Sequence, residues 1–227
     1  MIGALTASGL MAVSAALVAA IPPQTSERPG EAESDRRSGR LPDEERTGPS
    51  DWLQKFPGPQ RGFLIRLQSL CDDERYEGRL VSNDTQDEAL QSERFAIGPA
   101  ECTLSADGAL SSIAIPVAFG DDRSRTWHVM RTDSGLALRH RHASAEGSDQ
   151  SPERYGGVAD GGGTFTRQVF TPDAETRQAF TADDRIASLE NVWAVEIAPG
   201  DSFAYEMTRP GRTFRVEFDL ATPARAD

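Results

Sequence analysis

The sequence predicts a mainly β domain, an antiparallel β-barrel or β-sandwich of the lipocalin-like or jelly-roll-like kind, with one or two short helices. Three observations lead to this prediction. Apolar and polar residues alternate from Tyr76 onward, turn sequences rich in glycine and aspartate separate the alternating segments, and most connections between them are short. Sequential hairpins with short loops are typical of antiparallel all-β folds.

Two segments precede this domain. Residues 1–21 carry no charged side chain and end in small residues before Pro22-Pro23, which predicts a signal peptide. An uncleaved N-terminal anchor is an alternative, because about 20 apolar residues just span a bilayer. A misread start is a third possibility, since no Lys or Arg opens the apolar run. Residues 22–51 are rich in Pro, Gly, Ser and charged side chains, which predicts a disordered linker.

The β-rich domain is predicted over residues 52–222, with a disordered tail at 223–227. Its first element is a helix over 60–71, where apolar residues recur at helical spacing behind two prolines. A second helix is predicted near 172–182. There Thr171-Pro172-Asp173 supplies an N-cap, a proline at the first helical position and an acid in the first turn.

Ten strands are predicted from the period-two pattern. The last three show it most clearly, because apolar residues such as Trp193, Tyr205 and Phe218 share one face while Glu and Arg occupy the other. One face of each strand is therefore expected in the core and one in solvent. The predicted strands are 76–82, 93–97, 101–106, 110–119, 125–131, 136–142, 164–170, 191–198, 202–208 and 213–220.

The two cysteines, Cys71 and Cys102, are predicted to form a disulfide. An even number of cysteines in an exported protein is typical of disulfide bonding. Two free thiols are the alternative, and no CxxC pair is present to favour a metal site.

Composition excludes several classes of function. The formal net charge is −12 and the pI is about 4.8, which argues against binding of nucleic acid or of an anionic membrane surface. The common nucleotide-binding, hydrolase and metalloprotease motifs are absent. The sequence therefore predicts no cofactor and no catalytic residue, and it leaves open whether the protein is an enzyme.

Three histidines lie on one predicted hairpin and are the best candidates for a site. A four-residue loop, Thr132–Gly135, pairs Trp127 with His140 and Arg125 with His142. His128 then points to the opposite face, so the pattern disfavours a site in which all three histidines bind one zinc ion. The alternatives are a polar ligand pocket and a strand end that simply turns polar as it leaves the core. The pocket would be formed by Arg125, Trp127, His140 and His142.

The longest irregular stretch covers about residues 143–163 and contains Tyr155-Gly156-Gly157. Structureless runs of this length in compact domains are usually either functional lids or disordered. Because the stretch leaves directly from His142, we expect a lid over the histidine face and add Tyr155 to the candidate ligand-binding residues.

Several segments of the chain resemble a group of uncharacterised bacterial secreted proteins of about this size. These segments lie within residues 70–220 and are Gly120–Trp127, Leu136–His142, Tyr155–Gly157, Asn191–Ala194 and Phe214–Leu220. The resemblance implies export and a single domain, and it carries no catalytic or binding residue over to this chain.

The function expected from these observations is that of an exported, periplasmic or extracellular binding module for a small ligand. An envelope protein–protein interaction domain is one alternative. A hydrolase-type or lyase-type enzyme, with His140 or His142 as general base and Arg125 stabilising an anion, is another. Contact with a membrane is expected only if the N-terminal segment is uncleaved. A cavity beside His140 would favour binding or catalysis over the interaction domain.

Overall fold

The computed structural model describes residues 56–106, 108–143 and 155–224. The predicted signal peptide and linker lie outside the described residues. The helices are α2 (Gly58–Leu67) and α3 (Ala174–Ala182), with 3-10 turns η1 (Gln68–Leu70), η2 (Thr85–Leu90) and η3 (Ile186–Glu190). The strands are β1 (Tyr76–Leu80), β2 (Phe95–Ile97), β3 (Glu101–Leu104), β4 (Leu110–Phe119), β5 (Asp122–Thr132), β6 (Gly135–His142), β7 (Tyr155–Ala159), β8 (Arg167–Pro172), β9 (Val192–Ala198), β10 (Ser202–Arg209) and β11 (Arg212–Pro223).

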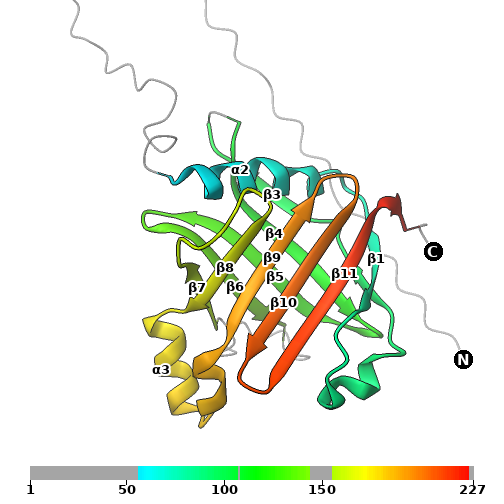
Figure 1. The fold of residues 1–227 in the computed structure, drawn as a ribbon. Coiled ribbons are helices and arrows are strands. Elements are labelled where there is room, and N and C mark those ends of the chain that lie inside the picture. Colours follow the sequence, from blue (N-terminus) through cyan, green and yellow to red (C-terminus); the bar gives the residue numbers. More distant parts are fainter. Residues whose placement is uncertain (1–55, 107, 144–154, 225–227) are drawn as a thin grey trace, which may run out of the picture. The chain divides into compact units, whose positions relative to one another are not determined.

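The strands form a closed antiparallel β-barrel, which confirms the predicted fold class and selects the barrel over the sandwich (Figure 1). Neighbouring strands follow the order β2-β1-β11-β10-β9-β8-β7-β6-β5-β4, and β2 pairs again with β4 to close the ring. β3 is an additional strand on the edge of β4. β1 joins the ring by pairing with β11, where Leu80 lies opposite Val216.

The hairpin of β5 and β6 has the predicted register. Trp127 pairs with His140, and Arg125 pairs with His142. The connection is tighter than the predicted four-residue loop, because Thr132 already pairs with Gly135. Gly135 adopts a φ of +126°, and a Cβ there would lie 3.0 Å from Oε1 of Gln60. Both the backbone conformation and the close approach of α2 therefore favour glycine at this position.

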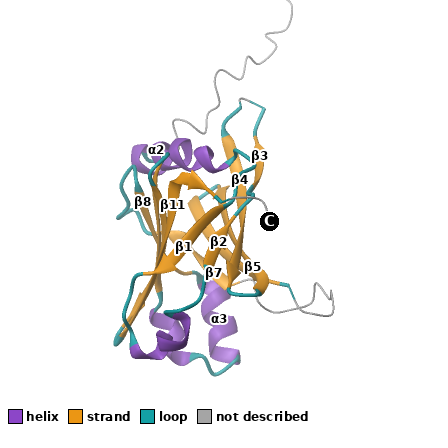
Figure 2. Cartoon of the chain, turned by 90° about the vertical axis from the view of Figure 1, so that its right-hand side faces the viewer, coloured by secondary structure: helices purple, strands orange, loops and turns teal. Residues whose placement is uncertain are grey.

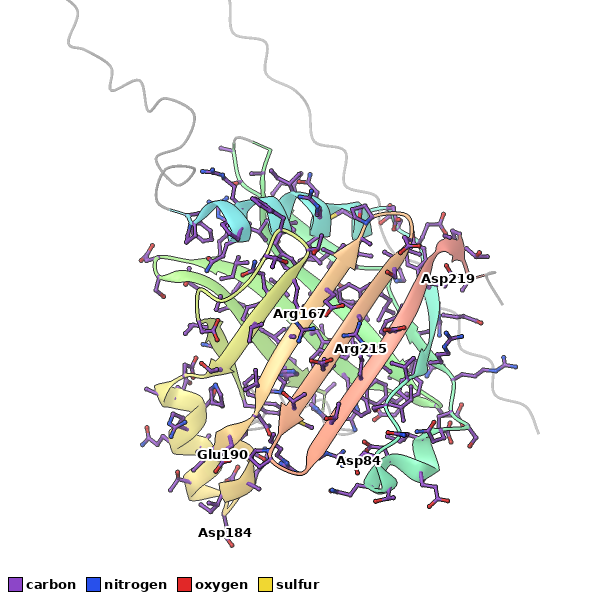
Figure 3. The ribbon with its side chains drawn as sticks, viewed as in Figure 1. Asp84, Arg167, Asp184, Glu190, Arg215 and Asp219 are labelled. Carbon is purple, nitrogen blue, oxygen red and sulfur yellow. A yellow bond between two sulfur atoms is a disulfide. The ribbon has the colours of Figure 1, made fainter. Side chains whose placement is uncertain are left out.

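The inner face of the barrel is aromatic and aliphatic, as the alternation predicts. Phe203, Val216 and Phe218 are at most 1% exposed. The outer face of β8 to β11 carries an ion-pair network instead, in which Arg215 bonds to Glu196 at 2.8 Å and to Glu206 at 3.2 Å. Figure 3 shows Arg167 and Arg215 on this face, and Arg167 pairs with the same two glutamates.

One end of the barrel is covered by α2, while α3 lies at the opposite end (Figure 2). Phe63, Leu64 and Leu67 of α2 are at most 2% exposed and belong to the same core as the strands. Gln60 accepts a hydrogen bond at 3.1 Å from the backbone N–H of Leu136, which fixes the helix to the start of β6. Burial of each large apolar side chain of α2, such as Phe63, stabilises the fold by roughly 1.5–3 kcal/mol.

The predicted disulfide is present between Cys71 and Cys102, with their Cα atoms 5.9 Å apart. Cys71 follows η1, and Cys102 lies on β3. The bond therefore ties the end of the α2–η1 segment to the edge of the barrel wall.

Three local predictions are wrong. Thr171 and Pro172 belong to β8, and the N-cap of α3 is Asp173, whose Oδ1 accepts from the backbone N–H of Thr176 at 2.9 Å. Residues 155–159, predicted to be part of an irregular lid, form β7 between β6 and β8. The predicted boundary between the domain and the tail is also wrong, because Pro223 still belongs to β11.

Candidate functional site

All five residues predicted for a ligand site line one cavity at the end of the barrel opposite α2. The cavity has a volume of about 270 Å³. This is just below the range of roughly 300–1,000 Å³ that is usual for ligand sites, so any occupant is a small molecule. The five residues are Arg125, Trp127, His140, His142 and Tyr155.

The register of three neighbouring strands brings these residues together. Arg125 and Trp127 of β5 pair with His142 and His140 of β6, and His140 pairs in turn with Tyr155 of β7. Tyr155 thus reaches the site as part of the barrel wall. Of the rest of the predicted lid, residues 144–154 lie outside the described residues, and residues 160–163 are part of the connection from β7 to β8.

His140 is buried and has a hydrogen bond at each ring nitrogen. Nδ1 lies 3.3 Å from the carbonyl oxygen of Tyr155, and Nε2 lies 2.7 Å from the hydroxyl of Tyr205. Burial lowers the pKa of His140 to about 3, so the ring is neutral at physiological pH. A neutral ring has one donor, which serves the carbonyl, and Nε2 therefore accepts from Tyr205. In this state neither nitrogen is available to take a proton from a substrate.

Aromatic rings form the floor of the cavity. The rings of Trp127 and Tyr205 stack at a centroid distance of 4.1 Å, and those of His140 and Tyr155 stack at 4.7 Å. The ring centroids of Trp193 and His140 lie 5.1 Å apart. Such a floor offers flat apolar surface to a ring or short chain of a ligand.

Arg125 is held at the rim by interactions on two sides. Its Nε donates to Oδ2 of Asp122 at 3.0 Å, and its Nη1 lies 3.2 Å from Nε2 of His142. Hydrogen bonds from the Ser124 side chain and backbone, with the charge of Arg125, lower the pKa of Asp122 to about 2. The carboxylate is therefore charged at physiological pH and keeps Arg125 oriented.

The three histidines do not converge on one point. Trp127 and Val129 face the core on β5, so His128 lies on the outer face, away from His140. His128 is half-buried there, and burial followed by the charge of Arg141 lowers its pKa. Across the described ranges, His, Cys, Asp and Glu side chains form no group of three that would hold a metal ion.

Sequence analysis missed the other half of the rim. Asn191, Arg209 and Arg212 line the cavity, as do Arg185 and Ser188 from the η3 segment. A signal was present in the sequence. Each of the first three residues lies two positions from an inward-facing apolar residue at the end of a strand, as Arg125 does on β5, and so has the same orientation. These apolar neighbours are Trp193, Met207, Phe214 and, for Arg125, Trp127.

The fold and site define a closed antiparallel β-barrel with one covered end and one polar, aromatic-floored mouth. No protein-family model, curated protein or solved structure matches the chain. The resemblance to uncharacterised secreted proteins therefore stays a prediction. Within the part of the chain that the structure describes, no helix has the length and apolar character needed to cross a bilayer.

Proposed function

We propose that this protein is an exported binding module that holds a small molecule in the mouth of its barrel. The observation that carries the proposal is the convergence of all five predicted residues on one cavity of about 270 Å³. A few polar groups above an apolar floor are the usual composition of a small-molecule site.

The proposed location rests on the disulfide. The bond between Cys71 and Cys102 is consistent with an oxidising compartment, since disulfides are rare in the cytosol. Together with the predicted signal peptide, it supports a periplasmic or extracellular location.

The cavity favours ligand binding over a surface interaction domain, and the hydrogen bonds of His140 argue against this residue as the general base of an enzyme. A general base needs an available nitrogen, and both nitrogens of His140 are hydrogen-bonded within the protein. A domain that acts only through its surface has no need of an inward-facing polar rim, because buried polar groups destabilise the fold unless they are satisfied.

A thermal-shift screen against small periplasmic metabolites and metal ions tests the proposal. We expect at least one small molecule to raise the unfolding midpoint by about 5 °C or more at a concentration of about 100 Kd. The variant Met207→Trp fills the mouth, because Met207 lines the cavity, and it should abolish the shift. The matched variant Met130→Trp makes the same change on the outer face of β5 and should keep it.

Two results would contradict the proposal. One is a screen in which no compound raises the midpoint of the wild-type protein. The other is a compound whose shift survives unchanged in Met207→Trp, because it must then bind elsewhere.

A further inference from the structure

The cavity at the mouth is strongly cationic although the chain as a whole is acidic. The formal net charge of the chain is −12, yet none of the described residues that line the cavity is Asp or Glu. The cationic residues that line it are Arg125, Arg185, Arg209 and Arg212. Arg141 also borders it, but its place in the register of β6 puts it on the outer face with His128. A low-dielectric cleft lined by charges of one sign attracts the opposite sign.

Two of these arginines already have a carboxylate partner outside the cavity. Arg125 pairs with Asp122, and Arg212 pairs with Asp87 at 2.7 Å. Such pairs hold the guanidinium groups in place and neutralise much of their charge.

Arg185 and Arg209 have no carboxylate partner among the described residues. The guanidinium of Arg185 lies 4.4 Å from the ring centroid of Phe180 and 5.0 Å from that of Tyr155. Arg209 donates to Oγ of Ser188 at 3.3 Å. Arg209 also interacts through its charge with the carboxylate of Asp84. Among the described residues, however, the direct contacts of both guanidinium groups are with neutral groups, which leaves them able to bind an anion at one side of the mouth.

Asn191 adds an independent sign of a missing ligand. It lines the same cavity and is 6% exposed. Its Oδ1 is buried and accepts no hydrogen bond from the described residues. Buried polar atoms are nearly always satisfied in folded proteins, so this oxygen points to a donor outside the described part of the chain, which a ligand would supply.

From these observations we infer that the ligand is a small aromatic carboxylate that also carries a hydrogen-bond donor. Arg185 and Arg209 bind its carboxylate, because a guanidinium matches a carboxylate in both charge and geometry. The ring lies against the aromatic lining of the cavity, and the donor is on the side of Asn191. This inference rests on the proposed function, since it names the class of ligand for the same mouth.

The matched probes 4-hydroxyphenylacetate and 4-hydroxyphenylacetamide test the role of charge. They share the ring and the hydroxyl and differ in the negative charge. Binding is followed by NMR through the indole N–H signals of Trp127 and Trp193, which both line the cavity. We expect the acid to bind at least about 10-fold more tightly than the amide, because its hydrogen bonds to the arginines are charge-assisted.

The double variant Arg185→Gln/Arg209→Gln should remove most of this preference, because it should weaken binding of the acid far more than binding of the amide. Arg79→Gln, an exposed arginine of β1, should keep it. If acid and amide bind equally and the double variant changes neither, the inferred charge recognition is wrong while small-molecule binding at the mouth stands. If neither probe moves the indole signals, the inferred ligand class is wrong, and the screen with Met207→Trp decides the proposed function separately.

Discussion

The two ends of the barrel differ in chemistry, although the same strands run between them. At the covered end, Phe63 and Leu67 of α2 lie against the inner faces of the strands and are fully buried. At the mouth, the inward-facing series ends in residues such as Arg125 and Asn191, which surround a cavity. The comparison shows that the same strand register builds a filled core at one end of the barrel and a cavity at the other. The residues that terminate each strand decide whether that end of the barrel is filled by core side chains or keeps a polar cavity.

Core substitutions should affect the covered end most. Phe63→Ala should destabilise the fold by about 3–5 kcal/mol, because it leaves a cavity in a closely packed region. The matched change Phe165→Ala removes a ring that is 52% exposed and should cost about 0.5–1 kcal/mol. Urea denaturation measures both. Equal stability of the two variants would show that α2 is not part of the core.

Removal of the disulfide should lower the stability of the fold without changing binding at the mouth. In the chain-entropy model, Cys71→Ser/Cys102→Ser should lower the free energy of unfolding by about 3–4 kcal/mol. Because the bond lies at the covered end, the affinity of the folded variant for 4-hydroxyphenylacetate should be unchanged. Urea denaturation and the NMR titration check the two parts. A large change in affinity would show that the ends are coupled.

A smaller effect is expected from pH, and it arises at the mouth. The pKa of His140 is about 3 in the folded protein and 6.5 in the unfolded chain. Below pH 6.5 the unfolded chain binds more protons, so stability is complete above pH 6.5 and is lost progressively as the pH falls toward 3. Between pH 6.5 and 5 the loss should be about 1–2 kcal/mol.

His140→Gln keeps hydrogen-bonding capacity without a titrating group, so its stability should fall less steeply over this interval. His128→Gln is the matched control on the outer face. Since His128 is only half-buried, its replacement should alter the slope less. Urea denaturation at several pH values gives the slopes, and equal slopes for His140→Gln and the wild-type protein would contradict the prediction.

Much of the barrel followed from local patterns, and the exceptions have physical reasons. The pairing of Trp127 with His140 was predictable because burial allows only one register for that hairpin. β7 was missed because Gly156 and Gly157 lower strand propensity. Each packs so tightly that an added Cβ would lie 1.9 Å from a carbonyl oxygen of a neighbouring strand. Glycine at these positions thus reflects close approach of strands.

The candidate site was half predictable for a related reason. Arg125, His140 and His142 share a hairpin, so their proximity follows from one turn. Arg185 lies just before η3 and Arg209 ends β10, and only closure of the whole barrel brings them to the same cavity as the histidines. The spacing of residues along the sequence does not predict which residues from distant strands come together.

The pairing of β1 with β11 has a consequence for the order in which the molecule is completed. Leu80 lies opposite Val216. The wall of the barrel is therefore continuous only when β1, the first described strand, has paired with β11, the last. During synthesis, the hairpin of β5 and β6 can form as soon as it emerges, but β1 keeps an unpaired edge until β11 follows. A chain that stalls before β11 therefore exposes strand edges to proteases and to other nascent chains. The arginines that line the mouth come together around one cavity only when the barrel has closed.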